Sequence, residues 1–143
     1  MTALREPGCE LCQLSAPVAW RGEKFSVIVV DDANYPGFCR VIWHDHVREM
    51  SDLARDDRLL VNEAVFVVEQ AVREVMQPLK VNVASLGNVV PHLHWHIIPR
   101  YADDAQFPAP VWAQAVRETP SAILAARRAL ADQLGAAIAR RFN

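Results

Sequence analysis

No apolar run in the sequence approaches the ~20 residues that a membrane-spanning helix requires. Positive charge is not in excess either. The 15 Lys and Arg residues against 17 Asp and Glu residues give a formal net charge of −2, so the chain as a whole has no basic footprint for nucleic acid or a membrane surface. Internal repeats and low-complexity tracts are also lacking. We therefore expect neither a nucleic acid nor a membrane among the partners.

Cysteines are few and odd in number, three in all, which does not suit a disulfide framework. Residues 1–12 are charged and lack the apolar core of a signal peptide. We therefore expect a cytoplasmic protein with reduced thiols. With 52% hydrophobic and 22% charged residues, the 143-residue chain has the composition of an ordinary globular protein. Its length suits a single domain over residues 1–143.

Three histidines, His92, His94 and His96, alternate with large apolar residues between Pro91 and Pro99. Strict alternation of polar and apolar residues predicts a β-strand with unlike faces. The histidines then share one face, roughly 6.6 Å apart at ~3.3 Å per residue, and the apolar residues between them point into the core. A helix would scatter the three imidazoles at about 100° per residue. The alternation therefore indicates a functional cluster rather than a chance composition.

The remaining apolar patterns predict an α+β fold. Short strands are predicted at 19–20, 25–30, 38–43 and 79–84, and apolar positions at helical spacing predict a helix over 56–77. Asp56 or Asp57 can cap this helix. Thr119 as cap and Pro120 as the first helical residue predict one further helix to the end of the chain. We expect an antiparallel sheet of about five strands, with the 56–77 helix on one face and the other face free for a ligand.

Cys9 and Cys12 form a CxxC motif. It suits half of a zinc site, a redox pair or a coincidence. A redox pair calls for a thioredoxin-like βαβ context, and none follows. A zinc site calls for two more ligands, and outside the triad only His44 and His46 are histidines. The third cysteine, Cys39, lies inside a predicted strand and is interpreted as a small core residue.

The run from His92 to Ile98 resembles the His-x-His-x-His-x-x signature of the histidine triad (HIT) family, in which x is apolar, and Pro99 and Arg100 resemble a common continuation of it. The family comprises nucleotide hydrolases and transferases that act on the α-phosphate, usually as homodimers. The resemblance implies a purine nucleotide substrate, a homodimer and no organic cofactor.

The resemblance and the chemistry agree on the triad. A phosphate ester repels an anionic nucleophile, whereas a neutral imidazole, with an ordinary pKa near 6.5, does not. His94 is central and matches the family's transiently nucleotidylated histidine. Its second nitrogen must donate to fix the tautomer, and a backbone carbonyl is the expected acceptor. His96 and His92 can hydrogen-bond non-bridging phosphate oxygens.

Other site residues follow from the resemblance alone. It implies that Asp31 meets the ribose, that Asn82 faces the phosphates, and that Asn88 keeps a family amide. Val89 stands where the family has Ser or Thr, so the hydroxyl that would assist the leaving group is missing. For the aspartates, the competing interpretation is that Asp31 and Asp32 cap a turn. For Asn82, it is that the side chain bonds to nearby backbone.

Some family members complete a zinc site from an N-terminal CxxC, a downstream histidine and one triad histidine. The resemblance thus implies a structural zinc at Cys9, Cys12, His46 and His92, in which case His92 positions the strand and does not touch phosphate. The alternative is two thiols without metal. His44, which stands beside Trp43 in place of the family's Pro-Lys, is expected to be exposed.

Two rival functions stay open. One is a metal-dependent hydrolase with the triad itself as the zinc site, since His-x-His on a strand is a credible ligand pair. Ligands two residues apart in a strand diverge, however, so three such histidines rarely reach one ion. The other is a module that binds nucleotides without turnover, which the loss of the hydroxyl at Val89 favours.

Overall fold

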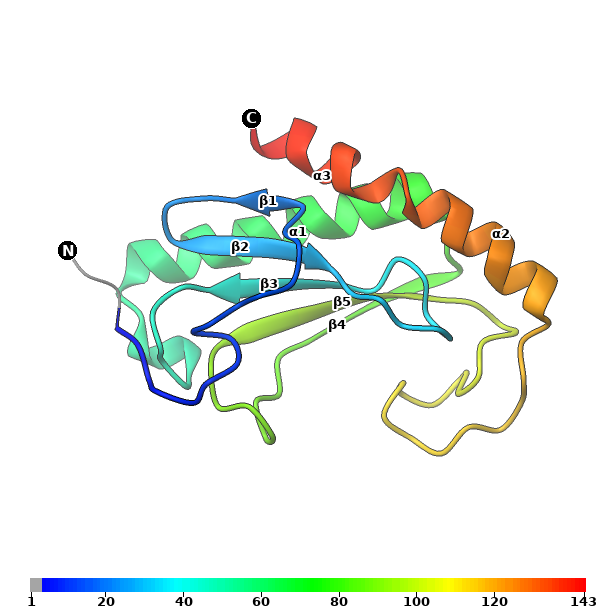
Figure 1. Ribbon diagram of the computed structural model, residues 1–143, viewed down its shortest axis with the longest axis horizontal. Helices are drawn as coiled ribbons and strands as arrows, with labels where there is room; N and C mark the ends of the chain where they lie inside the picture. The colour runs from blue at the N-terminus through cyan, green and yellow to red at the C-terminus, as the bar shows by residue number, and fades with distance from the viewer. Residues whose placement is uncertain (1–3) are drawn as a thin grey trace.

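The computed structural model describes residues 4–143 and has a five-stranded antiparallel sheet (Figure 1). The order is β1-β2-β3-β5-β4, with every neighbouring pair antiparallel. The strands are β1 (Trp20–Arg21), β2 (Phe25–Val29), β3 (Cys39–Trp43), β4 (Lys80–Ala84) and β5 (His94–Arg100). The helices are the short 3-10 helix η1 (Met50–Asp52), α1 (Arg55–Met76), α2 (Ser121–Ala131) and α3 (Leu134–Phe142). The predicted α+β architecture is confirmed.

Helix α1 covers one face of the sheet (Figure 1). Its buried side chains recur at helical spacing and form a single apolar stripe. They are Val61, Ala64, Val65, Val68, Ala71, Val72 and Met76. Odd-numbered strand residues, such as Val41 and Ile97, are fully buried in the same core, because successive side chains of a strand point to opposite faces. The opposite face is left to the even-numbered residues, among them His94 and His96.

The turn between β2 and β3 brings the chain close to α1. Gly37 there has a φ of +90°, a left-handed conformation that favours glycine. A Cβ at this position would lie 2.8 Å from Met76 Cγ. A side chain at position 37 would therefore strain the turn and push against the Met76 side chain at the end of α1.

The helix over 56–77 is confirmed, but its start differs from the prediction. Ala54 is the N-cap residue, and neither Asp56 nor Asp57 caps the helix. The chain is already helical at Arg55, so the two aspartates lie in the first turn, where negative charge complements the helix dipole. Asp57 instead pairs with Lys24 at 2.6 Å.

The predicted C-terminal helical segment is confirmed, but its start differs from the prediction and it is divided into two helices. The Thr119 hydroxyl donates to the carbonyl of Asp103 (2.7 Å) and does not cap the helix; Pro120 is the N-cap residue. The chain then breaks between α2 and α3. Helix α2 buries none of its residues, whereas α3 buries Leu134, Ala137 and Ile138 against the core. The break lets α3 pack on α1 and β1 while α2 lies at the surface.

A buried ion pair organises the segment that follows β5. Arg100 donates through Nε to Asp104 (2.8 Å), and both side chains are at most 2% exposed. The Asp104 carboxylate also accepts hydrogen bonds from the Tyr35 hydroxyl and from the backbone N–H groups of Tyr101 and Phe107. These bonds hold residues 101–109 against the end of the sheet. No helix within residues 4–143 is long and apolar enough to cross a membrane.

Candidate active site

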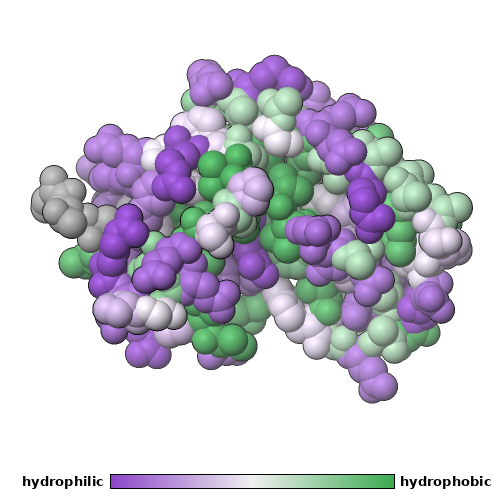
Figure 2. Space-filling view, viewed as in Figure 1, coloured by the Kyte–Doolittle hydropathy of each residue, from purple (hydrophilic) through white to green (hydrophobic). Residues whose placement is uncertain are grey.

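A cleft of about 510 Å³ opens on the sheet face opposite α1. In Figure 2 the surface is hollowed between the loop from β4 to β5 on one side and the segment after β5 on the other. Its lining comes from five parts of the chain: the N-terminal segment, β3, the loop from β4 to β5, β5 itself and the segment after β5. The lining residues are Glu10, Leu11, Arg40, Leu86, Gly87, Asn88, Val89, Val90, His94, His96 and Trp112.

His94 and His96 form the floor of the cleft, with ring centroids 4.8 Å apart. His94 Nδ1 lies 2.6 Å from the carbonyl oxygen of His92. The Nδ1–H therefore donates to a backbone carbonyl, as the sequence predicts, and Nε2 keeps its lone pair for the cleft. The carbonyl of His94 accepts a hydrogen bond from the Ser85 hydroxyl (2.8 Å), which fixes the backbone on its other side.

Both imidazoles are held neutral. Burial lowers the pKa of His94, and the nearby positive charge of Arg40 lowers it further, although the bond to His92 opposes this. Burial, His94 and Arg40 together lower the pKa of His96 to about 4. At pH 7 the floor of the cleft thus presents uncharged nitrogen atoms, which suits attack on an anionic phosphorus centre.

Sequence reasoning missed Arg40 and Trp112. Arg40 is the cross-strand partner of His96, and Trp112 places its ring 5.1 Å from that of His96. A signal for Arg40 existed, since it is the one charged residue in the apolar run 38–43 and shares a strand face with Ile42. Trp112 had no such signal, because its place depends on the path of an irregular segment.

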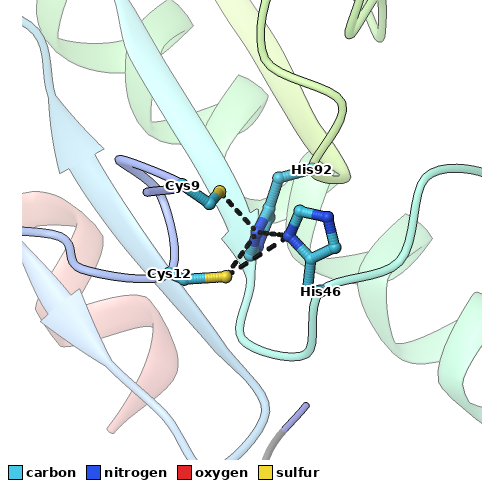
Figure 3. Close-up of side chains that lie close together, drawn as sticks. All are labelled: Cys9, Cys12, His46 and His92. Carbon is cyan, nitrogen blue, oxygen red and sulfur yellow. Dashed lines mark hydrogen bonds between the residues drawn. The ribbon is translucent and has the colours of Figure 1, made fainter. Parts of the chain in front are cut away.

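The CxxC motif lies beside His46 and His92 (Figure 3). The four ligand atoms all lie within 4.8 Å of one another. Cys12 Sγ is 3.3 Å from His46 Nδ1 and 3.4 Å from His92 Nδ1, Cys9 Sγ is 3.5 Å from His92 Nδ1, and the two Nδ1 atoms are 3.2 Å apart. A zinc tetrahedron with bonds of ~2.0–2.3 Å has edges of about 3.3–3.8 Å. The four donor separations of 3.2–3.5 Å are close to that geometry, and the remaining two are at most 4.8 Å.

His92 does not share a face with His94 and His96. The expectation of three imidazoles on one strand face is wrong, because β5 begins only at His94. The backbone turns just before it, where the N–H of His92 bonds to the carbonyl of Val90 (2.8 Å). The Nε2 of the His92 ring donates to the carbonyl of Trp43, and its Nδ1 faces the cysteines. Such a second bond orients a histidine as a metal ligand.

Other predicted site residues are dispersed. Asn88 lines the cleft. Asn82 lies on β4, and its Oδ1 accepts a hydrogen bond from Arg100 Nη1 (2.7 Å). Asp31 is exposed after β2 and lines a different surface hollow. Its neighbour Asp32 accepts hydrogen bonds from the N–H groups of two residues in the following turn, in the manner of a turn-forming aspartate.

His44 is half-buried, so its expected exposure is wrong. Its Nε2 lies 2.8 Å from the Ser26 hydroxyl and its Nδ1 lies 3.1 Å from the carbonyl of Glu23. These two bonds hold the ring against the sheet. Cys39 is fully buried in the core, as the sequence predicts.

The sequence matches the HIT domain family over residues 13–103, more than half of the chain. The chain belongs to the HIT family. HIT proteins comprise nucleotide-binding proteins and nucleotide hydrolases. The paired histidines and most of the cleft lining lie within the matched region, and Glu10, Leu11 and Trp112 lie outside it.

Solved structures of HIT proteins have the same fold. One is a histidine triad protein from Bradyrhizobium japonicum, with 27% identity, coverage of 93% of this chain and 99% of that chain, and a TM-score of 0.69. Another, from Marinobacter aquaeolei, has 26% identity, 87% and 95% coverage, and a TM-score of 0.65. A zinc-bound family protein from Mycobacterium smegmatis has 20% identity, 90% and 94% coverage, and a TM-score of 0.56. A comparison with curated proteins found no match.

Proposed function

We propose that this HIT protein cleaves purine nucleotides at the α-phosphate through a covalent nucleotidyl intermediate on His94, with release of a nucleoside monophosphate. The observation that carries the proposal is the bond from His94 Nδ1 to the carbonyl of His92, because it leaves a neutral Nε2 at the floor of the cleft. Proximity and a fixed tautomer are what a nucleophilic imidazole requires.

In the first step, the lone pair of His94 Nε2 forms a bond to the α-phosphorus, and the bond from phosphorus to the leaving group breaks with its electron pair. In the second step, the oxygen of a water molecule forms a bond to the same phosphorus, the electron pair of the N–P bond returns to His94, and the water loses a proton to solvent. His96 supports both steps. Its Nδ1 is buried without a partner among residues 4–143, which favours a proton on Nε2, from where it can donate to a phosphate oxygen. In the cleft, Asn88 can supply an amide donor.

We assign Cys9, Cys12, His46 and His92 as ligands of a structural zinc, because two thiols and two imidazole nitrogens converge at tetrahedral spacing. The ion would tie the N-terminal segment to the strand pair and leave the chemistry to the other two histidines. His92 accordingly serves the metal rather than the phosphate. Asp31 and Asn82 remain proposed ribose and phosphate contacts; in this structure neither lines the cleft.

A catalytic zinc on the triad is disfavoured by the same geometry. Within the described part of the chain, the converging group of ligand atoms includes one triad histidine only. The proposal that turnover occurs, rather than binding alone, is supported by the neutral pair His94 and His96 and by the fixed tautomer of His94.

A homodimer and a cytoplasmic location are part of the proposal. Strand β4 is an edge of the sheet, and an unpaired edge is a ready surface for another chain. Apolar side chains on β4 and α1, among them Val83 and Phe66, are 37% and 56% exposed. Free thiols that hold a metal suit a reducing compartment.

The deciding experiment compares His94→Asn with the native protein on diadenosine triphosphate, with mononucleotide release as the readout. Asparagine keeps the size and removes the attacking nitrogen, so turnover should fall by several orders of magnitude while nucleotide binding persists. His96→Asn should cost less, on the order of 10²–10³-fold, as for one oxyanion-stabilising donor. Acid-quenched native protein should carry the added mass of a nucleoside monophosphate on His94. Near-native turnover by His94→Asn would refute the assignment.

A further inference from the structure

The guanidinium of Arg40 lies in the cleft with no carboxylate of residues 4–143 at ion-pair distance. Burial lowers its pKa by more than the nearby Glu10 and Asp32 raise it. Arg40 lies opposite His96 in the register of β3 and β5, and its side chain lines the cleft beside both catalytic histidines. Its Nε is buried and has no hydrogen-bond partner among residues 4–143, and no ion pair links it to a carboxylate of that part of the chain. A partly desolvated charge is costly unless an anion pairs with it. The cleft is thus built for a ligand with negative charge at this point.

The lining of the same cleft holds no hydroxyl, thiol or ammonium group to protonate an amine leaving group; its one carboxyl is that of Glu10, and the proton of His96 is assigned to a phosphate oxygen. Val89, on the loop between β4 and β5, is 91% exposed and offers no hydroxyl. None of the lining residues is a serine, threonine, tyrosine, lysine or cysteine. An amine must gain a proton as its bond to phosphorus breaks, whereas a phosphate departs as a stable anion and needs only charge stabilisation. A cation in the cleft with no hydroxyl, thiol or ammonium group beside it therefore favours the anionic leaving group.

We propose that Arg40 binds the phosphate of the leaving group, so that this cleft selects nucleoside polyphosphates and cleaves them between the α- and β-phosphates. The inference rests on the proposed function and names its substrate class. As His94 Nε2 bonds to the α-phosphorus, the bond to the bridging oxygen breaks, and its electron pair stays on that oxygen, which becomes part of the departing phosphate. The guanidinium of Arg40, which lines the cleft beside His96, stabilises this charge.

The test compares two substrates that share the α-phosphate and differ in the leaving group, diadenosine triphosphate and adenosine 5′-phosphoramidate. Arg40→Met keeps the length and removes the charge. It should lower kcat/KM for diadenosine triphosphate on the order of 100-fold, and for the phosphoramidate by less than about 3-fold. Arg40→Lys, which keeps the charge without the planar fork, should recover part of the loss. Arg140→Met, a loss of one exposed charge on α3 away from the cleft, is the matched control and should leave both rates unchanged.

Equal losses on both substrates, or no loss on either, would overturn the inference. A binding measurement separates this result from a failure of the proposed function. The probes are AMP and its non-hydrolysable diphosphate counterpart, α,β-methylene-ADP, titrated by calorimetry. Arg40→Met should weaken the diphosphate about 10- to 100-fold and AMP little, whether or not the native protein turns over. If both probes weaken equally, or neither weakens, Arg40 does not bind the second phosphate. Unchanged thermal unfolding of the variant verifies its fold.

Discussion

His96 is 5% exposed, and it packs edge-on against the rings of Phe38, His94 and Trp112. These aromatic neighbours provide no hydrogen bond to Nδ1. Protonation would place a charge in this poorly solvated environment, so the neutral form is favoured well below the usual pH. A histidine that stays neutral can donate one hydrogen bond to a phosphate oxygen, and it places no positive charge beside the neighbouring His94.

We predict that the His96 imidazole titrates near pH 4 in the folded protein and near 6.5 once unfolded. Its contribution to stability is then complete above about pH 6.5 and is lost as the pH falls toward 4. Long-range ¹H–¹⁵N spectra recorded against pH report the ring directly, and the His96→Asn variant identifies its signal. A midpoint near 6.5 in the folded state would contradict the prediction.

The cleft residues differ in how far the sequence could reveal them. His94 and His96 were predictable because alternation along one strand is a local property. Arg40 becomes part of the site only through the pairing of β3 with β5, which no local pattern specifies. His92 was misplaced because the alternation continues past the point where the backbone leaves the sheet. The strand register and the turns therefore determine which of these side chains reach the cleft, and the sequence pattern alone does not specify either.

At the scale of elements, the two C-terminal helices differ in their packing. One apolar stripe at helical spacing runs through both in the sequence, from Ile123 to Ile138. Only α3 reaches the core, since the chain turns between Ala131 and Leu134. The pattern predicted helical structure correctly, but burial depends on where the helix breaks, and that break has no strong sequence signal.

A matched pair of substitutions tests this difference. Ile138→Ala in α3 removes a side chain that is 0% exposed and should lower the free energy of unfolding by about 2–5 kcal/mol. Ile123→Ala in α2, where the side chain is 36% exposed, should cost less than about 1 kcal/mol. Urea unfolding followed by circular dichroism measures both. Equal losses would mean that α2 packs as tightly as α3.

The N-terminal segment depends on the metal that it is proposed to bind. We predict about one zinc per chain in protein purified without added metal, and less than a tenth of that in Cys12→Ser, because losing a thiolate from a four-ligand site removes much of the affinity. Cys39→Ala is the matched control, since that thiol is buried in the core and away from the cluster. Metal analysis by mass spectrometry measures the zinc content of each protein. Native protein without zinc but with intact thiols would refute the site.

At the scale of the whole molecule, residues 4–143 form one sheet with a covered face and an open face, and the cleft lies on the open one. The sequence predicted this division, because five short strands and one long amphipathic helix have few other ways to bury their apolar sides. It could not predict how the N-terminal segment and the segment after β5 enclose the cleft. Their paths depend on the cysteine cluster and on the buried pair of Arg100 and Asp104.

The proposed homodimer gives a prediction at this scale. Light scattering at micromolar concentration should give twice the chain mass of 16.0 kDa. Val83→Lys on the edge strand should shift the protein toward monomer, because a charge opposes edge-to-edge pairing. Lys24→Ala is the control. It removes an exposed charge just before β2, away from the β4 edge, and should leave the mass unchanged. A native monomer at this concentration would count against the dimer.

The alternation along β5 also bears on how the strand tolerates substitution. Ile97, and Leu93 just before the strand, face the core, and His94 and His96 face the cleft. Changes at Leu93 or Ile97 thus reduce how much folded protein a cell accumulates, whereas changes at His94 or His96 mainly reduce the activity of each molecule. Substitutions that change the amount of folded protein and substitutions that change the activity of each molecule therefore fall at neighbouring positions. Either property can change with little effect on the other.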